Sequence, residues 1–283
     1  MKIISGLCFL LLVSTVNAQV DFQRLLTITQ SKTASYQAPS FNKIQHCQQL
    51  FYQALSTGYT KNLQQAWLQQ GFSLTQQDGV LVIKALKNQG EGVYVIKEKK
   101  QVPLIALQAP HSFKDLHTGK IIAELLQHPQ FYAGGWNSVP RYGAYSQDLA
   151  HLDNSIFQAF TQALAQAHPD SWIVQLHGFN QKKRKTATGQ RAEMILSNTE
   201  SDSPVWLQTL AQHLRQQWRH KHIEIYPQTI RELGGTKNRN AFLLKRQGFT
   251  HFIHIETSKK MRDELRHHPQ SRQVFIQALQ QLP

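Results

Sequence analysis

Two histidines and a glutamate in this chain each stand at the end of a short apolar segment: His111, His177 and Glu256. Short apolar runs of this kind are typical of buried β-strands. The strands of an open α/β sheet deliver side chains to one crevice at their C-terminal edge, so we expect the three residues to converge there. Asp115, four residues beyond His111, would lie close to them.

These residue types in this pattern point to metal-assisted hydrolysis. A catalytic zinc needs about three protein ligands and one open position for water. His111 and Asp115 would supply two ligands from one loop, and His177 would supply the third from a second strand end. The metal would lower the pKa of bound water and polarise a carbonyl, and Glu256 would act as the general base. With 14 histidines in the chain, a histidine after a strand also arises by chance, which is the alternative for each histidine alone.

The elements that must position these residues alternate between strands and helices from residue 104 onward. Such alternation predicts a mixed, mostly parallel central sheet with helices on both faces. An opening hairpin would form its antiparallel edge. We expect strands at 79–86, 92–97, 104–108, 171–176, 193–196, 222–226 and 250–255, helices at 41–55, 62–70, 118–126, 148–167, 204–219, 240–246 and 271–282, and loops at 130–144 and 180–191.

The first 18 residues read as a secretory signal peptide, with Lys2 before a short apolar core and small residues at the end. We therefore expect a periplasmic or secreted protein whose residues 19–283 form a single α/β domain, because no composition break divides them. No other stretch approaches the roughly 20 apolar residues of a transmembrane helix. After cleavage one cysteine would remain, Cys47, which excludes an internal disulfide and a thiolate zinc site.

The chain is strongly basic, with 31 Lys and Arg against 17 Asp and Glu and a formal charge of +14. Nucleic acid, the anionic cell envelope and an acidic small-molecule or peptide substrate all suit such a charge. Export and the lack of a groove-reading motif argue against nucleic acid. The dense run at 182–185 follows His177, so it would lie at the rim of the site and attract anionic substrates. A solvated basic loop is the alternative.

Three short strings resemble a known group of enzymes: Ala-Pro-His-Ser at 109–112, Gln-Leu-His-Gly at 175–178 and His-Ile-Glu-Thr-Ser at 254–258. They look like the zinc amidohydrolase branch of the carboxypeptidase-like superfamily, which includes N-formylglutamate amidohydrolases, poly-gamma-glutamate hydrolases and succinylglutamate desuccinylases. The likeness covers about residues 104–266. It implies a zinc-carboxypeptidase/phosphorylase-hydrolase-like fold, a zinc held by two histidines and one acidic residue, and a glutamate base on a late strand.

Carried over to this chain, the resemblance makes His111 and His177 zinc ligands and Glu256 the base. Many relatives have His-x-x-Glu where this chain has Asp115 after a three-residue gap, so Asp148 is the second candidate for the acidic ligand. The other interpretation of Asp148 is a cap of the predicted helix at 148–167. His151, near the same helix end, would orient a ligand or contact the substrate, or else be a partly exposed helix residue.

Relatives also hold the substrate carboxylate with arginines, and Arg239 and Arg262 are the candidates here. Their alternatives are a solvated helix start and a surface charge. Together these features predict an exported zinc-dependent hydrolase that cleaves an amide bond near a carboxylate, in a peptidoglycan peptide, a γ-glutamyl polymer or an N-acyl amino acid. The alternative is a non-catalytic protein that binds anionic envelope polymers through a basic surface on a degenerate hydrolase fold. The sequence carries no signal for an oligomeric state.

Overall fold

The computed structural model describes residues 20–34, 36–141 and 148–283. The predicted signal peptide at 1–18 lies outside these residues. The strands are β1 (Phe72–Gln77), β2 (Val80–Ala85), β3 (Val93–Lys97), β4 (Ile105–Ala109), β5 (Phe131–Trp136), β6 (Trp172–Gly178), β7 (Met194–Ser197), β8 (Ile223–Ile225) and β9 (Phe252–Thr257). The helices are α1 (Phe22–Thr29), α2 (Phe41–Thr57), α3 (Lys61–Gln69), α4 (Thr118–Leu125), α5 (Ile156–Ala167), the 3-10 helix η1 (Gln181–Lys183), α6 (Ala187–Arg191), α7 (Val205–Gln217), α8 (Arg239–Arg246), α9 (Lys259–His267) and α10 (Pro269–Leu279).

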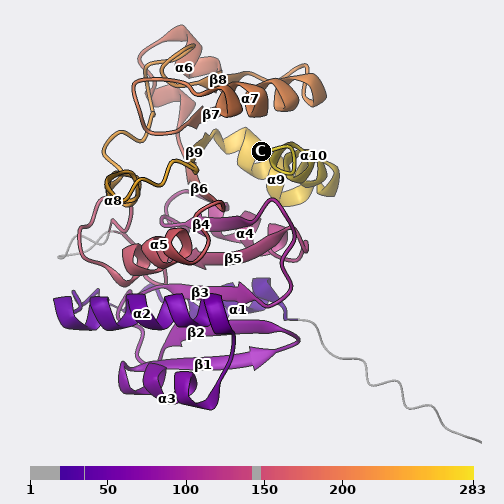
Figure 1. The fold of residues 1–283 in the computed structure, drawn as a ribbon. Coiled ribbons are helices and arrows are strands. Elements are labelled where there is room, and N and C mark those ends of the chain that lie inside the picture. The colour runs from indigo at the N-terminus through magenta and orange to yellow at the C-terminus, as the bar shows by residue number, and fades with distance from the viewer. Residues whose placement is uncertain (1–19, 35, 142–147) are drawn as a thin grey trace, which may run out of the picture.

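The strands of the described residues form one sheet in the order β1-β2-β3-β5-β4-β6-β9-β7-β8, which Figure 1 shows as a single stack. The four middle strands, β5, β4, β6 and β9, run parallel to their neighbours in that group. The first three strands pair antiparallel and join the parallel group through β3 and β5. The expected mixed α/β fold, parallel in the middle, is confirmed.

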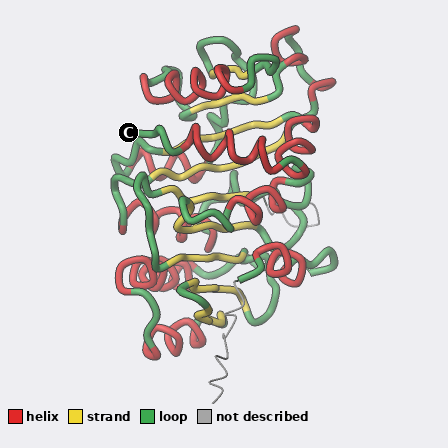
Figure 2. Tube along the Cα trace, turned by 90° about the vertical axis from the view of Figure 1, so that its right-hand side faces the viewer, coloured by secondary structure: helices red, strands yellow, loops and turns green. Residues whose placement is uncertain are grey.

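Helices cover both faces of the sheet, so each face has its own apolar core (Figure 2). One core takes side chains from α1, α4, α7, α9 and α10, and the other takes them from α2, α3, α5 and α8. Strands that are covered on both faces must be apolar on both faces. Polar side chains inside the middle strands are therefore exceptions that need a physical reason.

Such exceptions occur at the C-terminal ends of β4, β6 and β9. In the parallel register Gln108 lies beside Gln175, Gln175 beside His254, and His177 beside Glu256. Paired residues of neighbouring strands point to the same face, and so do residues two apart on one strand. The register thus gathers five polar side chains on one face, at the sheet edge where open α/β folds bind ligands.

The sequence did not predict α1, β1, α9 or the helices within 180–191. Two further differences bear on the site. The predicted loop at 130–144 contains β5, a fully buried strand in the middle of the sheet. A Cβ at Gly134 would lie 2.8 Å from a methyl carbon of Leu126 and 3.1 Å from the Leu107 carbonyl oxygen, so the glycine follows from close packing and not from a loop. The predicted helix at 148–167 begins at Ile156, where Ser155 provides the N-cap. Asp148 therefore lies in the turn before that helix and does not cap it.

No helix in the described part of the chain is long and apolar enough to span a membrane.

Candidate metal centre

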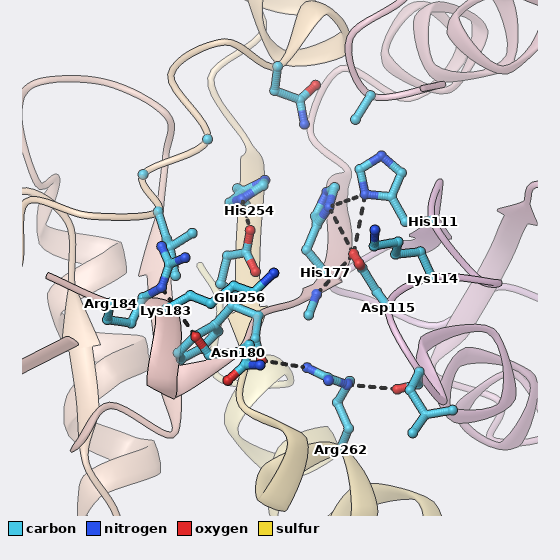
Figure 3. A pocket seen from close by; sticks show the side chains of 18 of the residues that line it. His111, Lys114, Asp115, His177, Asn180, Lys183, Arg184, His254, Glu256 and Arg262 are labelled. Carbon is cyan, nitrogen blue, oxygen red and sulfur yellow. Dashed lines mark hydrogen bonds and ion pairs between the residues drawn. The ribbon is translucent and has the colours of Figure 1, made fainter. Parts of the chain in front are cut away.

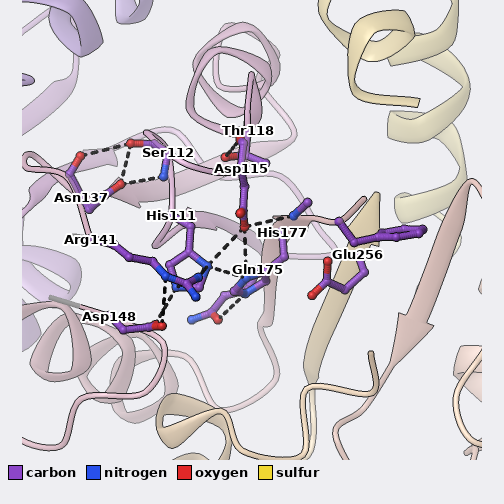
Figure 4. A network of polar contacts seen from close by, with 12 residues as sticks. His111, Ser112, Asp115, Thr118, Asn137, Arg141, Asp148, Gln175, His177 and Glu256 are labelled. Atoms are coloured by element: carbon purple, nitrogen blue, oxygen red, sulfur yellow. Dashed lines mark hydrogen bonds and ion pairs between the residues drawn. The ribbon is translucent and has the colours of Figure 1, made fainter. Parts of the chain in front are cut away.

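His111 and Asp115 are held together by a single helical turn that follows β4. The Asp115 amide donates to the His111 carbonyl at 2.9 Å, and residues four apart on such a turn face the same side. Asp115 Oδ2 lies 3.2 Å from His111 Nδ1. The same oxygen accepts the backbone N–H of Gly178 at 3.0 Å, which ties the turn to the end of β6. Figure 4 shows the Asp115 carboxylate between the two histidines.

His177 is held on β6 by a chain of buried amide side chains. Its Nε2 donates to Gln175 Oε1 at 3.3 Å, and Asn238 Nδ2 donates to the same oxygen at 2.8 Å. Gln175 Nε2 in turn donates to Gln108 Oε1 at 2.8 Å. Because Gln175 Oε1 only accepts hydrogen bonds, Nε2 of His177 carries the ring proton. The lone pair is then on Nδ1, which faces His111.

The second nitrogen of His111 is bound by a different carboxylate. His111 Nε2 lies 2.6 Å from Asp148 Oδ1, and His151 Nδ1 lies 2.9 Å from the same oxygen. Arg141 Nε lies 3.3 Å from Asp148 Oδ2. Since the carboxylate only accepts, it orients the His111 ring with Nδ1 toward Asp115 and His177. A carboxylate behind a histidine is the usual second partner of a metal-binding imidazole.

The charged groups around the His111 and His177 rings favour a positive charge between the two rings. Burial lowers the pKa of His111, but hydrogen bonds to Asp115 and Asp148 outweigh burial and raise that pKa to about 9. Burial also lowers the pKa of His177, and with the neighbouring His254 and His111 it holds that pKa well below the usual range. His177 is therefore neutral, which is the form that binds metal ions.

The spacing of the three donor atoms fits a tetrahedral zinc site. His111 Nδ1 and His177 Nδ1 are 3.2 Å apart, and Asp115 Oδ2 lies 3.2 Å from the first and 3.8 Å from the second. Ligand bonds of about 2.0–2.1 Å at tetrahedral angles place ligand atoms roughly 3.3 Å apart. Two imidazoles and a carboxylate are also a donor set that zinc accepts. The residues present thus fit the metal that the sequence predicts.

A second group of possible metal ligands shares His111 and adds Asp148 and His151. It uses the other nitrogen of His111, and the side chain of His151 is 49% exposed. The group of His111, Asp115 and His177 is fully buried. The arrangement therefore favours Asp115 as the acidic ligand and Asp148 as the group that orients His111. His151 lies at the pocket wall, where it contacts Asp148.

Glu256 lies beside His177 on the next strand, where Figure 3 shows it inside the pocket. Its Oε1 is 3.4 Å from His254 Nε2. Its Oε2 is buried and has no hydrogen-bond partner among the described residues. An unpartnered buried carboxylate oxygen is costly, so its retention indicates a function. A carboxylate in this position is suited to accept a proton from a water molecule.

The two arginines predicted to bind substrate have different surroundings. Arg262 is 6% exposed and lines the pocket. Its Nε donates to the Leu116 carbonyl at 2.7 Å, and its Nη1 donates to the Thr257 carbonyl. It is therefore not a surface charge, and it anchors α9 to the backbone around the site. Arg239 pairs with Asp153 at 2.7 Å and does not line the pocket, so the structure does not bring it to the site.

Several residues of the site were missed from the sequence. Gln175 and His254 have a recognisable signal, because each lies two positions before a candidate residue in an otherwise apolar strand. Arg141 has no such signal, since it follows a strand that was itself missed. Its Nη1 lies 3.2 and 3.4 Å from the two ring nitrogens of His111, so the guanidinium lies over the ring face.

These residues line a pocket of about 980 Å³. Eight lysine and arginine side chains line it, against two carboxylates, and both of these, Asp115 and Glu256, belong to the candidate centre. The pocket is therefore strongly basic outside the centre itself. Such a field raises the local concentration of anionic ligands.

Comparison with known proteins gives weak similarities. No family model matches this chain, and no curated protein matches it. A bacteriophage poly-gamma-glutamate hydrolase is 15% identical, with a TM-score of 0.36 over 67% of this chain and 87% of that chain. An aspartoacylase family protein from Mesorhizobium loti is 13% identical, with a TM-score of 0.41 over 74% and 70% of the two chains. A metallo-carboxypeptidase from Burkholderia cenocepacia is 7% identical, with a TM-score of 0.42 over 78% and 69%.

These solved structures belong to the same classes of protein that the sequence motifs resemble. At such identities and TM-scores the likeness carries no argument about what this chain does.

Proposed function

We propose that this protein is a zinc-dependent hydrolase that cleaves an amide bond near a carboxylate. One observation carries the proposal. Two buried histidines and an aspartate bring their donor atoms within 3.2–3.8 Å of one another, beside a glutamate with an unpartnered buried oxygen. The glutamate is not explained by packing, because a buried carboxylate oxygen without a hydrogen-bond partner costs stability.

In this proposal His111, Asp115 and His177 hold the zinc, which when bound lowers the pKa of water and polarises the carbonyl. Asp148 and Gln175 keep the two rings in the orientation that turns Nδ1 toward the centre. Glu256 accepts a proton from the attacking water and delivers it to the leaving nitrogen. Because the C–N bond breaks as that nitrogen is protonated, one carboxylate can serve both steps.

We further propose that Arg141 holds the carboxylate of the substrate. Its side chain is 28% exposed at the pocket wall and lies over His111, and a guanidinium binds a carboxylate through two parallel hydrogen bonds. Arg262 supports the backbone of the site. With the signal peptide predicted at 1–18, the proposed location is the periplasm or the exterior. There the candidate substrates are peptidoglycan stem peptides, γ-glutamyl compounds and N-acyl amino acids.

The basic lining of the pocket also suits a second function, the binding of anionic envelope polymers without catalysis. The two functions differ in what Glu256 does. A catalytic base is essential for turnover, whereas a binding protein with a cationic pocket gains from the loss of a negative charge.

A panel of amides tests the proposal. Wild-type protein supplied with zinc is incubated with N-acyl amino acids, γ-glutamyl dipeptides and stem peptides, and products are measured by mass spectrometry. We expect hydrolysis of at least one class, a loss of about 100-fold or more in Glu256→Gln, and no change in Glu200→Gln, an acidic residue outside the pocket that pairs with Lys245. Equal activity in wild type and Glu256→Gln would exclude the proposed mechanism.

A further inference from the structure

The segment after His177 is fixed in place, unlike the polar loop expected at 180–191. It forms η1 and α6. Glu232 accepts hydrogen bonds from the backbone N–H groups of Lys185 and Thr186, at 3.1 and 3.0 Å, and from the Thr186 hydroxyl at 2.7 Å. These hydrogen bonds hold the backbone that follows the lysines of η1 at the rim of the pocket.

Three lysines that line the pocket form no ion pair within the described residues. Lys182 and Lys183 on η1 and Lys237 before α8 are exposed, and all three line the pocket. None of the three pairs with an acidic side chain elsewhere in the described ranges. Arg184 differs, because its guanidinium lies 3.7 Å from Glu232. The pocket thus presents three lysines whose charges are available to a ligand.

The opposite wall is also basic. Lys114 lies in the turn that links His111 to Asp115, and Arg141 lies over the His111 ring. Figure 3 shows Lys114 beside His111 on one side of the pocket and Lys183 on the other, with Glu256 between them. Positive charges therefore flank the candidate centre on two sides. A site for a single terminal carboxylate needs cations on one side only.

The size of the pocket agrees with this arrangement. Ligand pockets usually measure about 300–1,000 Å³ for a drug-sized molecule, and this pocket of about 980 Å³ is at the upper end. An N-acyl amino acid would occupy a small part of it and would meet one wall. We propose that the ligand is a chain with carboxylates on both sides of the scissile amide, bound across the pocket and cut at an internal bond. The cutting depends on the function proposed above, whereas the binding does not.

Binding is tested first, in a protein that cannot turn the ligand over. The probe is a fluorescein-labelled, end-capped octapeptide of glutamate, and its affinity for zinc-supplied Glu256→Gln protein is measured by fluorescence anisotropy. An octapeptide of glutamine is the uncharged control. We expect the glutamate probe alone to bind, with an affinity that falls as salt screens the charges.

Matched variants locate the binding. Changing Lys182, Lys183 and Lys237 together to Gln removes three charges from the pocket wall. The control changes Lys32, Lys61 and Lys99 to Gln, which removes three exposed charges outside the pocket. We expect binding about tenfold weaker in the wall variant and unchanged in the control. Equal losses in both variants, no loss in either, or no binding of the probe would overturn the inference.

Cleavage separates this inference from the proposed function. Wild-type protein is compared on the capped glutamate chain and on N-acetylglutamate. Faster cleavage of the chain, with a KM raised by the wall variant, supports both claims. If the wall variant weakens binding but no amide is hydrolysed, the proposed ligand class stands and the proposed hydrolase function is wrong. If only N-acetylglutamate is hydrolysed, at a rate that the wall variant does not change, the hydrolase function stands and the proposed chain-like ligand is wrong.

Discussion

His177 on β6 and Glu256 on β9 lie directly beside each other in parallel register, with their side chains on the same face of the sheet. The register places a neutral imidazole with its Nδ1 lone pair toward His111 next to a carboxylate with one unpartnered oxygen. A one-residue shift of either strand would turn its side chain to the opposite face. Strand pairing thus fixes the relation between the proposed ligand and the proposed base.

Asp115 and Asp148 are predicted to play separable roles. Asp115→Asn removes a charged ligand, so we expect zinc to be lost under conditions that leave wild type loaded. Asp148→Asn keeps all three donor atoms but loosens the His111 ring, so we expect zinc affinity to fall about 10–100-fold. Competition with a chelator measures both. If Asp148→Asn loses zinc and Asp115→Asn keeps it, the assignment of the acidic ligand is reversed.

Gln175 is predicted to support the centre without touching it. Gln175→Leu leaves the His177 Nε2–H and the Asn238 amide without their acceptor. We expect a loss of about 1–3 kcal/mol in the free energy of unfolding and zinc affinity about 10–100-fold weaker. Gln190→Leu, at an exposed position on α6, is the control. Wild-type zinc affinity in Gln175→Leu would show that the amide chain does not hold the His177 ring.

Gly235 is predicted to be essential for the position of His254. Its φ is +65°, and a Cβ there would lie 2.7–2.8 Å from three atoms of the His254 ring. Gly248 has a similar φ of +79° with nothing within 4 Å of an added Cβ. We expect Gly248→Ala to cost about 1 kcal/mol from backbone strain alone. Gly235→Ala should cost clearly more, as measured by denaturant unfolding. Equal costs would mean that the His254 ring moves aside freely.

Lys97 is predicted to make stability rise with pH in the alkaline range. Burial lowers its pKa to about 8, whereas the unfolded chain keeps it near 10.4. Above pH 8 the unfolded state therefore binds more protons than the folded state, so the folded state gains stability up to about pH 10. The gain should be on the order of 1–2 kcal/mol relative to Lys97→Gln, measured by urea unfolding. A difference that stays constant between pH 7 and about pH 10 would contradict the lowered pKa.

The strand ends that carry the site were predictable because their signals are local. An apolar run followed by His177 or Glu256 predicts a buried strand and a polar end, and parallel pairing brings such ends together. The role of Asp148 was not predictable in this way. It depends on a contact with His111, 37 positions away in the chain, and the helix thought to begin at Asp148 begins at Ile156.

The other differences between the sequence-based predictions and the structure also arise from contacts between residues far apart in the chain. The glycines at 130–144 predict a loop from local sequence, whereas Gly134 is needed because an added Cβ would lie 3.1 Å from the Leu107 carbonyl oxygen on the neighbouring strand. The resemblance makes Arg239 a candidate for substrate binding, yet Arg239 pairs with Asp153 away from the pocket. The basic run at 182–185 correctly predicts a charged rim of the pocket. The backbone after this run is held by hydrogen bonds to Glu232, which lies far along the chain and could not be inferred from the run itself.

The zinc content of the purified protein, measured by elemental mass spectrometry beside His177→Ala, tests the central claim most directly. We predict about one zinc per wild-type chain and its loss in the variant, because His177 supplies one of three buried donors. A wild-type protein that holds no metal after zinc is supplied and the excess removed would contradict the metal centre and the hydrolase built on it.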